Sequence, residues 1–327
     1  MLSLRTLEFD RIVDVVTGLA LTPLGAGVLA ELQPQTDPKT VADALNATTE
    51  TTAFLETKAL FPLRAGAGIG EALAGLQVQG QLLDPLALRV LVDFLDSVEI
   101  AGAGVRETTG AFPILTRVVS RAASFKREVD DVRRAIDPSG EVLDEASPEL
   151  GRLRDRLRQK RQRLRGTLEQ FVRGKDTAKY LQEEVITERN GRYVLMVRAE
   201  HRANVPGIVH GSSASGASLF LEPSATVEIN NDIVELEERE REEIRRILLA
   251  LTYLFRARSS DLEASLGVAI ELDVLQAKAR FGSLVNGVAP EIAIDGRLEL
   301  RSARHPLLID AVRKRLHDPA GRDTGRD

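Results

Sequence analysis

Two charged segments with regular apolar spacing most strongly constrain what this chain folds into. Apolar residues recur at steps of three, four and seven in the first segment and at similar spacing in the second, a pattern typical of helices that bury one seam against each other. The seam positions are Leu150, Leu153, Leu157, Leu164, Leu168 and Phe171 in the first segment, and Ile229, Ile233, Leu236, Ile244, Leu251, Leu262, Leu266 and Leu275 in the second. We therefore expect two long helices that pair.

The second segment contains no proline from about Thr226 to Asn286. A helix of about 60 residues would extend roughly 90 Å, because each residue adds about 1.5 Å. The sequence therefore predicts one helix of unusual length after residue 226.

Between the seam segments the pattern changes to short runs of β-branched and aromatic residues. The runs are Glu184–Thr187, Arg192–Ala199, Gly207–Val209 and Leu219–Leu221. Asn190-Gly191 separates the first two, and this pair is the strongest short-range signal for a tight hairpin. Because the runs interrupt two helices that could pair antiparallel, we expect a small antiparallel sheet at the tip of a helical arm.

The remaining sequence predicts shorter helices, so the fold class is mainly α with one small β domain. We expect two short helices within residues 4–32, one at Pro38–Lys58, and several with glycine breaks within 65–109. Phe112-Pro113 begins a longer stretch, which a turn at residues 137–140 interrupts. The predicted domains are a helical core (1–112), ascending lever helices (113–173), a clamp (174–225), a descending lever helix (226–287) and a remainder (288–327) with a polar tail from His317 to Asp327.

Composition excludes several classes of protein. The chain has no cysteine, which removes disulfides, thiolate nucleophiles and cysteine-based zinc sites. Charges interrupt the apolar positions near the start, so a signal peptide is not expected. No run is long and apolar enough to span a bilayer. These features favour the cytoplasm and no membrane partner. Because the net charge is −5, any attraction to nucleic acid must come from local patches.

The first seam segment is strongly basic, and this charge has two interpretations. The cations attract phosphate, or they pair with acids of the second segment and form a solvated helix face. We favour the second interpretation. The cations are Arg152, Arg154, Arg156, Arg158, Lys160, Arg161, Arg163 and Arg165, and the acids are Glu235, Glu237, Glu238, Glu240, Glu242 and Glu243.

The clamp sequence combines cations with a loop rich in glycine and serine, His210 to Gly216. Backbone N–H groups of such a loop can approach phosphate oxygens closely, and hydroxyl groups add neutral hydrogen bonds, which suits contact with a nucleic-acid backbone without base reading. The plainer alternative is a flexible hairpin connection. The expected contact residues are Lys175, Lys179, Arg189, Arg192, Arg198, Arg202, His210, Ser212, Ser213 and Ser215.

No motif for catalysis or cofactor binding is complete. The only Gly-Lys pair, Gly174-Lys175, lacks the first glycine of a nucleotide-binding loop, and the glycines of residues 66–70 lack dinucleotide spacing. The histidines have no metal-site spacing, and the serine loop lacks the strand-turn-helix context of a hydrolase. Phe54 lies in a Phe-x-Glu sequence at helical spacing, so we expect it in the core. We therefore expect no catalytic residue, cofactor or metal site in this chain.

Several blocks of the sequence resemble the MutS family, specifically its second-type branch. The blocks are LEFDRIVD with LTPLGAGVLAELQP, DDVRRAIDPSGEVLDEASPELGRLRDRLR, ERNGRYVLMVRAEHRANVPGIVHGSSASGASLFLEPSATVEINNDIVELE, and LELRSARHPLL. They span most of the chain, and their order is as informative as their content. The resemblance implies a core, a lever of long helices and a clamp inserted at the lever tip, in agreement with the pattern analysis.

The resemblance also implies properties of a complete protein. ATP and Mg²⁺ belong to an ATPase domain, whose opening segment resembles Arg301 to Leu308. We therefore expect residues 288–327 to be the truncated start of that domain. The family's ATPase and endonuclease activities are carried onto no residue of this chain.

Three functions remain open at this stage. In the leading hypothesis, two copies of the complete protein close their levers and clamps around branched or duplex DNA, in recombination suppression under ATPase control. In the second, the clamp recognises ribosomal RNA during rescue of collided ribosomes. In the third, the arm is structural and only mediates dimerisation.

Overall fold

The computed structural model describes residues 4, 6–58, 60–293 and 295–317. The chain divides into two compact units. We call residues 1–133, 138–140 and 251–327 the core unit, and residues 134–137 and 141–250 the arm unit. The protein is mainly α-helical with one small antiparallel sheet, which confirms the predicted fold class. The polar tail predicted beyond His317 lies outside the described residues.

The core unit is built from helices. They are α2 (Phe9–Thr17), α3 (Pro23–Ala30), α4 (Pro38–Lys58), α5 (Ile69–Gln77), α6 (Pro85–Arg106), α7 (Pro113–Val119), most of α8 (Lys126–Ala135), α11 (Ser259–Leu284), η4 (Pro306–Leu308) and α12 (Asp310–His317). The prediction of α4 is confirmed at both ends. In the part of the chain that is described, no helix is long and apolar enough to cross a membrane.

Helix α6 is longer than the short, glycine-broken helices predicted for residues 65–109. It continues through Gly102 and Gly104 to Arg106. Leu88, Leu91 and Val105 along it are fully buried. Packing of this apolar face outweighs the roughly 1 kcal/mol by which each glycine disfavours a helix.

The buried carboxylate of Asp273 in α11 holds the start of α3. It accepts hydrogen bonds from the backbone N–H groups of Leu21 and Thr22 at 2.8 and 2.9 Å, and from the Thr22 hydroxyl at 2.6 Å. Thr22 in turn accepts from the N–H of Gly25 and caps the helix. A Cβ atom at Gly25 would lie 2.3 Å from a carboxylate oxygen of Asp273. The glycine of the LTPLG sequence is therefore required by this contact.

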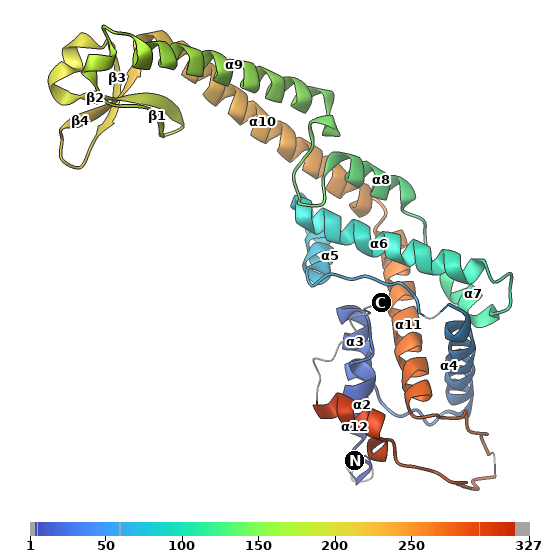
Figure 1. The fold of residues 1–327 in the computed structure, drawn as a ribbon. Coiled ribbons are helices and arrows are strands. Elements are labelled where there is room, and N and C mark those ends of the chain that lie inside the picture. The colour runs from blue at the N-terminus through green and yellow to red at the C-terminus, as the bar shows by residue number, and fades with distance from the viewer. Residues whose placement is uncertain (1–3, 5, 59, 294, 318–327) are drawn as a thin grey trace. The chain divides into compact units, whose positions relative to one another are not determined.

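Further side chains within residues 251–284 hold other segments of the core unit. Thr252 accepts a hydrogen bond from the N–H of Leu83 at 3.0 Å, and Gln276 accepts one from the N–H of Phe61 at 2.6 Å. Phe61 stacks on Phe54, whose side chain is buried as predicted. Earlier helices of the core unit, including α3 and α4, thus pack against α11 (Figure 1).

The predicted 60-residue helix is instead two helices, α10 (Ser224–Arg256) and α11, interrupted at Ala257-Arg258. Arg256 donates to four backbone carbonyl groups between Gly75 and Gln81. Arg258 stacks on the ring of Phe125 at 4.3 Å and pairs with Glu128 at 2.9 Å. These tertiary contacts hold the two arginines on the core unit, and the helix restarts after them.

The arm unit pairs α9 (Pro148–Arg173) with the part of α10 up to Ala250, as Figure 1 shows. The predicted seam residues Leu153, Leu157, Leu164 and Leu168 are buried in one cluster with α10 residues of the second seam. The prediction of paired helices is therefore confirmed for this part of α10. Leu251, Leu262 and Leu275, which were assigned to the same seam, are buried in the core unit instead.

Polar contacts between α9 and α10 fix an antiparallel register. Residues near the start of α9 meet residues near 240, and residues near 160 meet residues 232 and 237. The ion pairs are Glu149–Arg239, Arg154–Glu240, Lys160–Asp232 and Arg161–Glu237. The interpretation that these cations pair with the second helix is confirmed for Arg154, Lys160 and Arg161.

The sheet of the arm unit continues the same core. Its strands are β1 (Leu181–Arg189), β2 (Arg192–Arg198), β3 (Gly207–Ser212) and β4 (Ser218–Pro223), in the order β1-β2-β4-β3, all antiparallel. Leu195 and Leu221 of the central strands join Leu164 and Leu168 of α9 in one buried cluster. Asn190 and Gly191 both have positive φ, 53° and 74°, as a type I′ hairpin turn requires, which confirms the predicted hairpin.

We predict that Asp273→Ala lowers the free energy of unfolding by about 3 kcal/mol, because buried N–H groups and a hydroxyl lose their acceptor. Asp273→Asn retains one acceptor and should lose less. Urea unfolding followed by far-ultraviolet circular dichroism measures both. Glu263→Ala, an exposed change on the same helix, is the control. Equal stability of Asp273→Ala and the control would contradict the role of this carboxylate.

We also predict an acid-sensitive contribution from Asp144 in the arm unit. The hydrogen bond from Arg154 at 2.7 Å lowers the pKa of the Asp144 carboxyl. A folded pKa below the unfolded value of about 3.9 gives stability that is present above that pH and lost as the pH falls through the folded pKa. Melting temperatures between about pH 6 and pH 3 should therefore fall less steeply for Asp144→Asn than for the unmodified chain. The exposed neighbour change Glu145→Gln is the control, and a matching slope in Asp144→Asn and the unmodified chain would refute the prediction.

Candidate nucleic-acid interface

The strand register places the predicted contact residues at two ends of the sheet. Leu181 pairs with Val197 and Arg198 with Ser218, so the residues before β1 and the β3–β4 turn lie at one end. Arg189 pairs with Arg192 at the other end. Strand β2 separates the ends by about 20 Å, at roughly 3.3 Å per residue. The ten predicted residues therefore do not form one cluster.

We call Lys179, Arg198 and the turn Ser213–Gly216 the turn end of the sheet. Both cations are exposed, and neither makes an ion pair with any residue that the structure describes. The Lys179 ammonium lies 5.1 Å from the centre of the Tyr180 ring. Lys175 is also exposed, in the segment that leads from α9 to this end. These charges are available to a partner.

The β3–β4 turn is closed by its own hydrogen bonds. The N–H of Gly216 donates to the carbonyl of Ser213 at 2.9 Å, and the N–H of Ser218 donates to the Ser213 hydroxyl at 3.2 Å. Gly216 has a φ of +71°, which favours glycine. Within the described part of the chain, the N–H groups of Ala214 and Ser215 are not used by the turn. Ser212 and Ser215 are exposed beside them.

The opposite end is organised by Glu222, whose side chain is fully buried. Arg192 donates to both of its carboxylate oxygens at 2.8 and 3.1 Å, and the His210 ring nitrogen lies 2.6 Å from one of them. Asn230 donates to the carboxylate at 2.8 Å. A buried carboxylate requires such partners, because an unpaired charge away from water is strongly disfavoured. Arg192 and His210 are therefore part of the internal structure of the clamp.

Asn230 of α10 also makes the hydrogen bonds with the backbone of Tyr193 that a neighbouring strand residue would otherwise make. Its side-chain carbonyl accepts from the N–H of Tyr193 and its amide donates to the carbonyl of Tyr193, both at 3.2 Å. Strand β4 ends at Pro223, which has no N–H to donate. The carboxamide of Asn230 thus completes the ladder and fastens α10 to the sheet.

Two further predicted contact residues are held by neighbours. Arg202 donates to the carbonyl groups of Val205 and Gly207 at 3.2 and 2.8 Å. The Arg189 guanidinium lies over the Phe220 ring at 4.2 Å, although the side chain is exposed.

The sequence prediction did not include Glu222 and Asn230. The signal for Glu222 was an acidic residue that interrupts the apolar run LFLEP.

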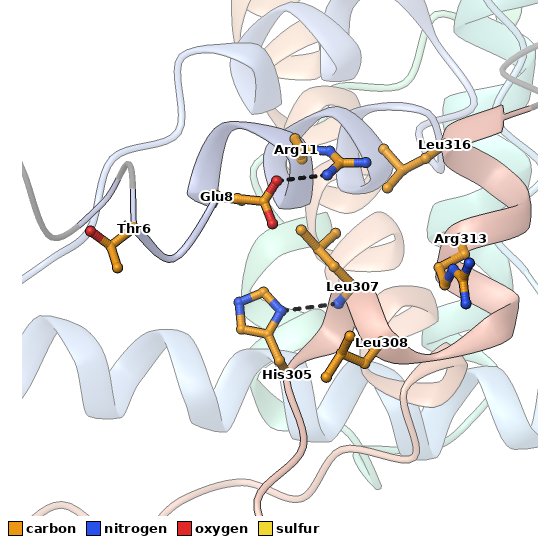
Figure 2. A pocket seen from close by; sticks show the side chains of 8 residues that line it. All are labelled: Thr6, Glu8, Arg11, His305, Leu307, Leu308, Arg313 and Leu316. Carbon is orange, nitrogen blue, oxygen red and sulfur yellow. Dashed lines mark hydrogen bonds and ion pairs between the residues drawn. The ribbon is translucent and has the colours of Figure 1, made fainter.

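The core unit also has a hollow of about 590 Å³, and Figure 2 shows the side chains that line it. Its lining residues are Thr6, Glu8, Arg11, His305, Leu307, Leu308, Arg313 and Leu316. Arg11 pairs with Glu8 at 2.6 Å, and the His305 ring contacts the carbonyl of Leu7 and the N–H of Leu307. These polar groups serve local structure, so we assign this hollow no ligand. Among the described residues, no group of three His, Asp or Glu side chains is placed to hold a metal ion.

Comparison with known proteins finds relatives that share one name. The chain is 37% identical over 317 residues to Endonuclease MutS2 of Symbiobacterium thermophilum, 34% over 312 residues to that of Pelotomaculum thermopropionicum, and 36% over 307 residues to that of Geobacillus kaustophilus. These matches cover 93–95% of this chain and 39% of each relative. The chain thus spans about two fifths of the length of these relatives. No protein-family model matches it.

We predict that Glu222→Gln destabilises the sheet by about 3 kcal/mol, because Arg192 loses its buried counter-charge. Hydrogen exchange of the N–H groups in β2 and β4 should accelerate, while exchange in α4 of the core unit stays unchanged. Glu188→Gln, an exposed change on β1, is the control. Slow exchange in the sheet of Glu222→Gln, equal to that of the unmodified chain, would show that the carboxylate does not organise the clamp.

Proposed function

Because this chain corresponds to the N-terminal MutS-like region of a MutS2 family protein, we propose that its clamp binds the backbone of DNA through the turn end. The observation that carries the proposal is the strand register, which gathers unpaired cations and unused N–H groups at one end of the sheet. Phosphate oxygens are the natural acceptors for such donors.

The charge of the clamp indicates how such contact would be made. Residues 174–225 contain six Lys and Arg and six Asp and Glu. The clamp is therefore neutral, and long-range attraction to a polyanion is not its contribution. Short-range hydrogen bonds from Lys179, Arg198 and the β3–β4 turn are what it offers. Such contacts position a nucleic acid without reading its sequence.

This proposal retains only some of the ten predicted contact residues. Arg192, Arg202 and His210 are engaged within the clamp, so replacing them tests folding rather than binding. Lys175, Lys179, Arg198, Ser212, Ser213 and Ser215 lie on or next to the turn end and form the proposed contact surface. Arg189 would lie at the edge of a second contact.

The role in a longer protein is part of the same proposal. Two copies would place their clamps on branched or duplex DNA to suppress recombination, under the control of ATP and Mg²⁺ bound by the ATPase domain that the family resemblance implies for the complete protein. The relatives are named endonucleases. We propose that this chain binds DNA. We assign no cleavage activity to it, because the relatives extend well beyond the part that it matches.

We predict that Lys179→Gln with Arg198→Gln lowers affinity for a DNA duplex by about 100-fold or more, because phosphate hydrogen bonds with a charged donor are each worth about 1.5 kcal/mol or more. Fluorescence anisotropy with a labelled duplex measures this. The control is Lys126→Gln with Arg127→Gln, two exposed cations of the core unit, which removes the same charge.

Equal affinity of the two double variants would remove the turn end from the interface. Binding of ribosomal RNA but not of duplex or branched DNA would replace the proposed ligand by the RNA alternative. Absence of binding to either nucleic acid, together with self-association of the chain, would favour a purely structural arm.

A further inference from the structure

The positive charge of the arm unit is concentrated on α9. Residues 148–173 contain nine Lys and Arg and three Asp and Glu, whereas α10 contains five Arg and eight Asp and Glu. The clamp between them is neutral. Attraction to a polyanion would therefore come from the helix that leads into the clamp.

Most cations of α9 are occupied by acids. Arg154, Lys160 and Arg161 pair with α10, and Arg158 pairs with Asp144 and Asp155. The remaining pairs lie within the helix and are Arg152–Glu149, Arg165–Glu169 and Arg173–Glu169. Arg156 and Arg163 are exposed, and neither has an ion pair or side-chain hydrogen bond with any described residue.

These two arginines lie on one side of the helix. Residues 156, 159, 163 and 170 are separated by three, four and seven positions, so they line up along one flank. We call Arg156, Gln159, Arg163 and Gln170 the α9 flank. Both glutamines are exposed too. The flank extends about 21 Å, at roughly 1.5 Å per residue, and presents donor groups with no acid among them.

We propose that the α9 flank is a second phosphate-binding surface, which attracts a nucleic-acid backbone and guides it to the clamp. This inference rests on the proposed function of the clamp and adds the surface that supplies its long-range electrostatics. Arginine suits the role because its planar fork donates to phosphate in pairs and stays charged at any physiological pH. Glutamine amides add neutral donors between the charges.

Continuity along the chain favours a nucleic acid over an acidic protein surface. Gln170 lies three residues before the end of α9, and the exposed Lys175 and Lys179 follow in the segment that leads to the turn end. Exposed donor groups therefore follow one another along the chain from Arg156 to Lys179, with the exposed Asp176 as the acid between Lys175 and Lys179. The acidic exposed side of α10 in a second copy is the competing occupant that the experiment must separate.

The helix itself provides a matched control. Arg158 and Arg165 are also seven residues apart, and their side chains are 59% and 78% exposed, but they lie on the opposite flank. Arg156→Gln with Arg163→Gln and Arg158→Gln with Arg165→Gln thus remove the same charge from the same helix. Glutamine keeps the helix propensity close to that of arginine.

The test measures binding of the full chain to a DNA duplex across a salt series. Loss of two phosphate contacts should make the negative slope of log affinity against log salt shallower by about 1.8. This corresponds to roughly 60-fold weaker binding at about 0.1 M salt. The Arg158/Arg165 control should retain the slope of the unmodified chain. Circular dichroism melts verify that both variants are folded.

The outcomes separate this inference from the proposed function. An unchanged slope in Arg156→Gln with Arg163→Gln, or an equal decrease in the control, overturns the flank, and the turn-end variants still decide the clamp. A loss of self-association in the flank variant, with DNA binding intact, also overturns it in favour of contact between copies. If the unmodified chain binds no nucleic acid, the proposed function fails first.

Discussion

The clamp depends on one buried carboxylate. Glu222 has no exposure to water and is balanced by Arg192, with His210 and Asn230 completing its hydrogen bonds. These partners come from β2, β3 and α10, so a single charge ties both central strands and an edge strand to the following helix. Removing the carboxylate would leave Arg192, His210 and Asn230 without this shared acceptor. This interaction fixes the sheet, and the turn end can then be presented by a rigid scaffold.

Pairing of opposite charges also explains most of the charged residues of the arm unit. Cations that lie against α10 are neutralised by its acids, and this pairing sets the register of the two helices. Arg154–Glu240 is partly buried, and the more exposed pairs contribute little stability, so the buried leucines provide most of the energy and the ion pairs provide the alignment. The cations that remain unpaired are those that no structural role explains. Pairing within the fold is therefore the filter that separates candidate binding residues from structural ones.

Local and periodic features were predictable from the sequence, and contacts between distant segments were not. Asn190-Gly191 specifies its turn by the conformations that these two residues tolerate, and the α9 leucines specify a seam by their spacing. The interruption at Ala257-Arg258 has no proline or glycine to mark it, because it arises from contacts of Arg256 and Arg258 with residues 75–81 and 125–128. Likewise, a list of clamp cations does not reveal that Arg192 and Arg202 face internal acceptors. Their spacing along the chain is compatible with either role.

A neutral clamp on a basic helix divides two tasks that a single basic patch would combine. Attraction by unpaired charge acts over a distance of about 8 Å at physiological salt, so it raises the local concentration of a polyanion but does not orient it. Hydrogen bonds from a closed turn act only at contact, and they fix orientation. If α9 adds attraction and the turn end fixes orientation, the turn-end cations Lys179 and Arg198 contribute to both the salt dependence and the geometric preference of binding. Changes on α9 would then alter the salt dependence without altering the geometric preference.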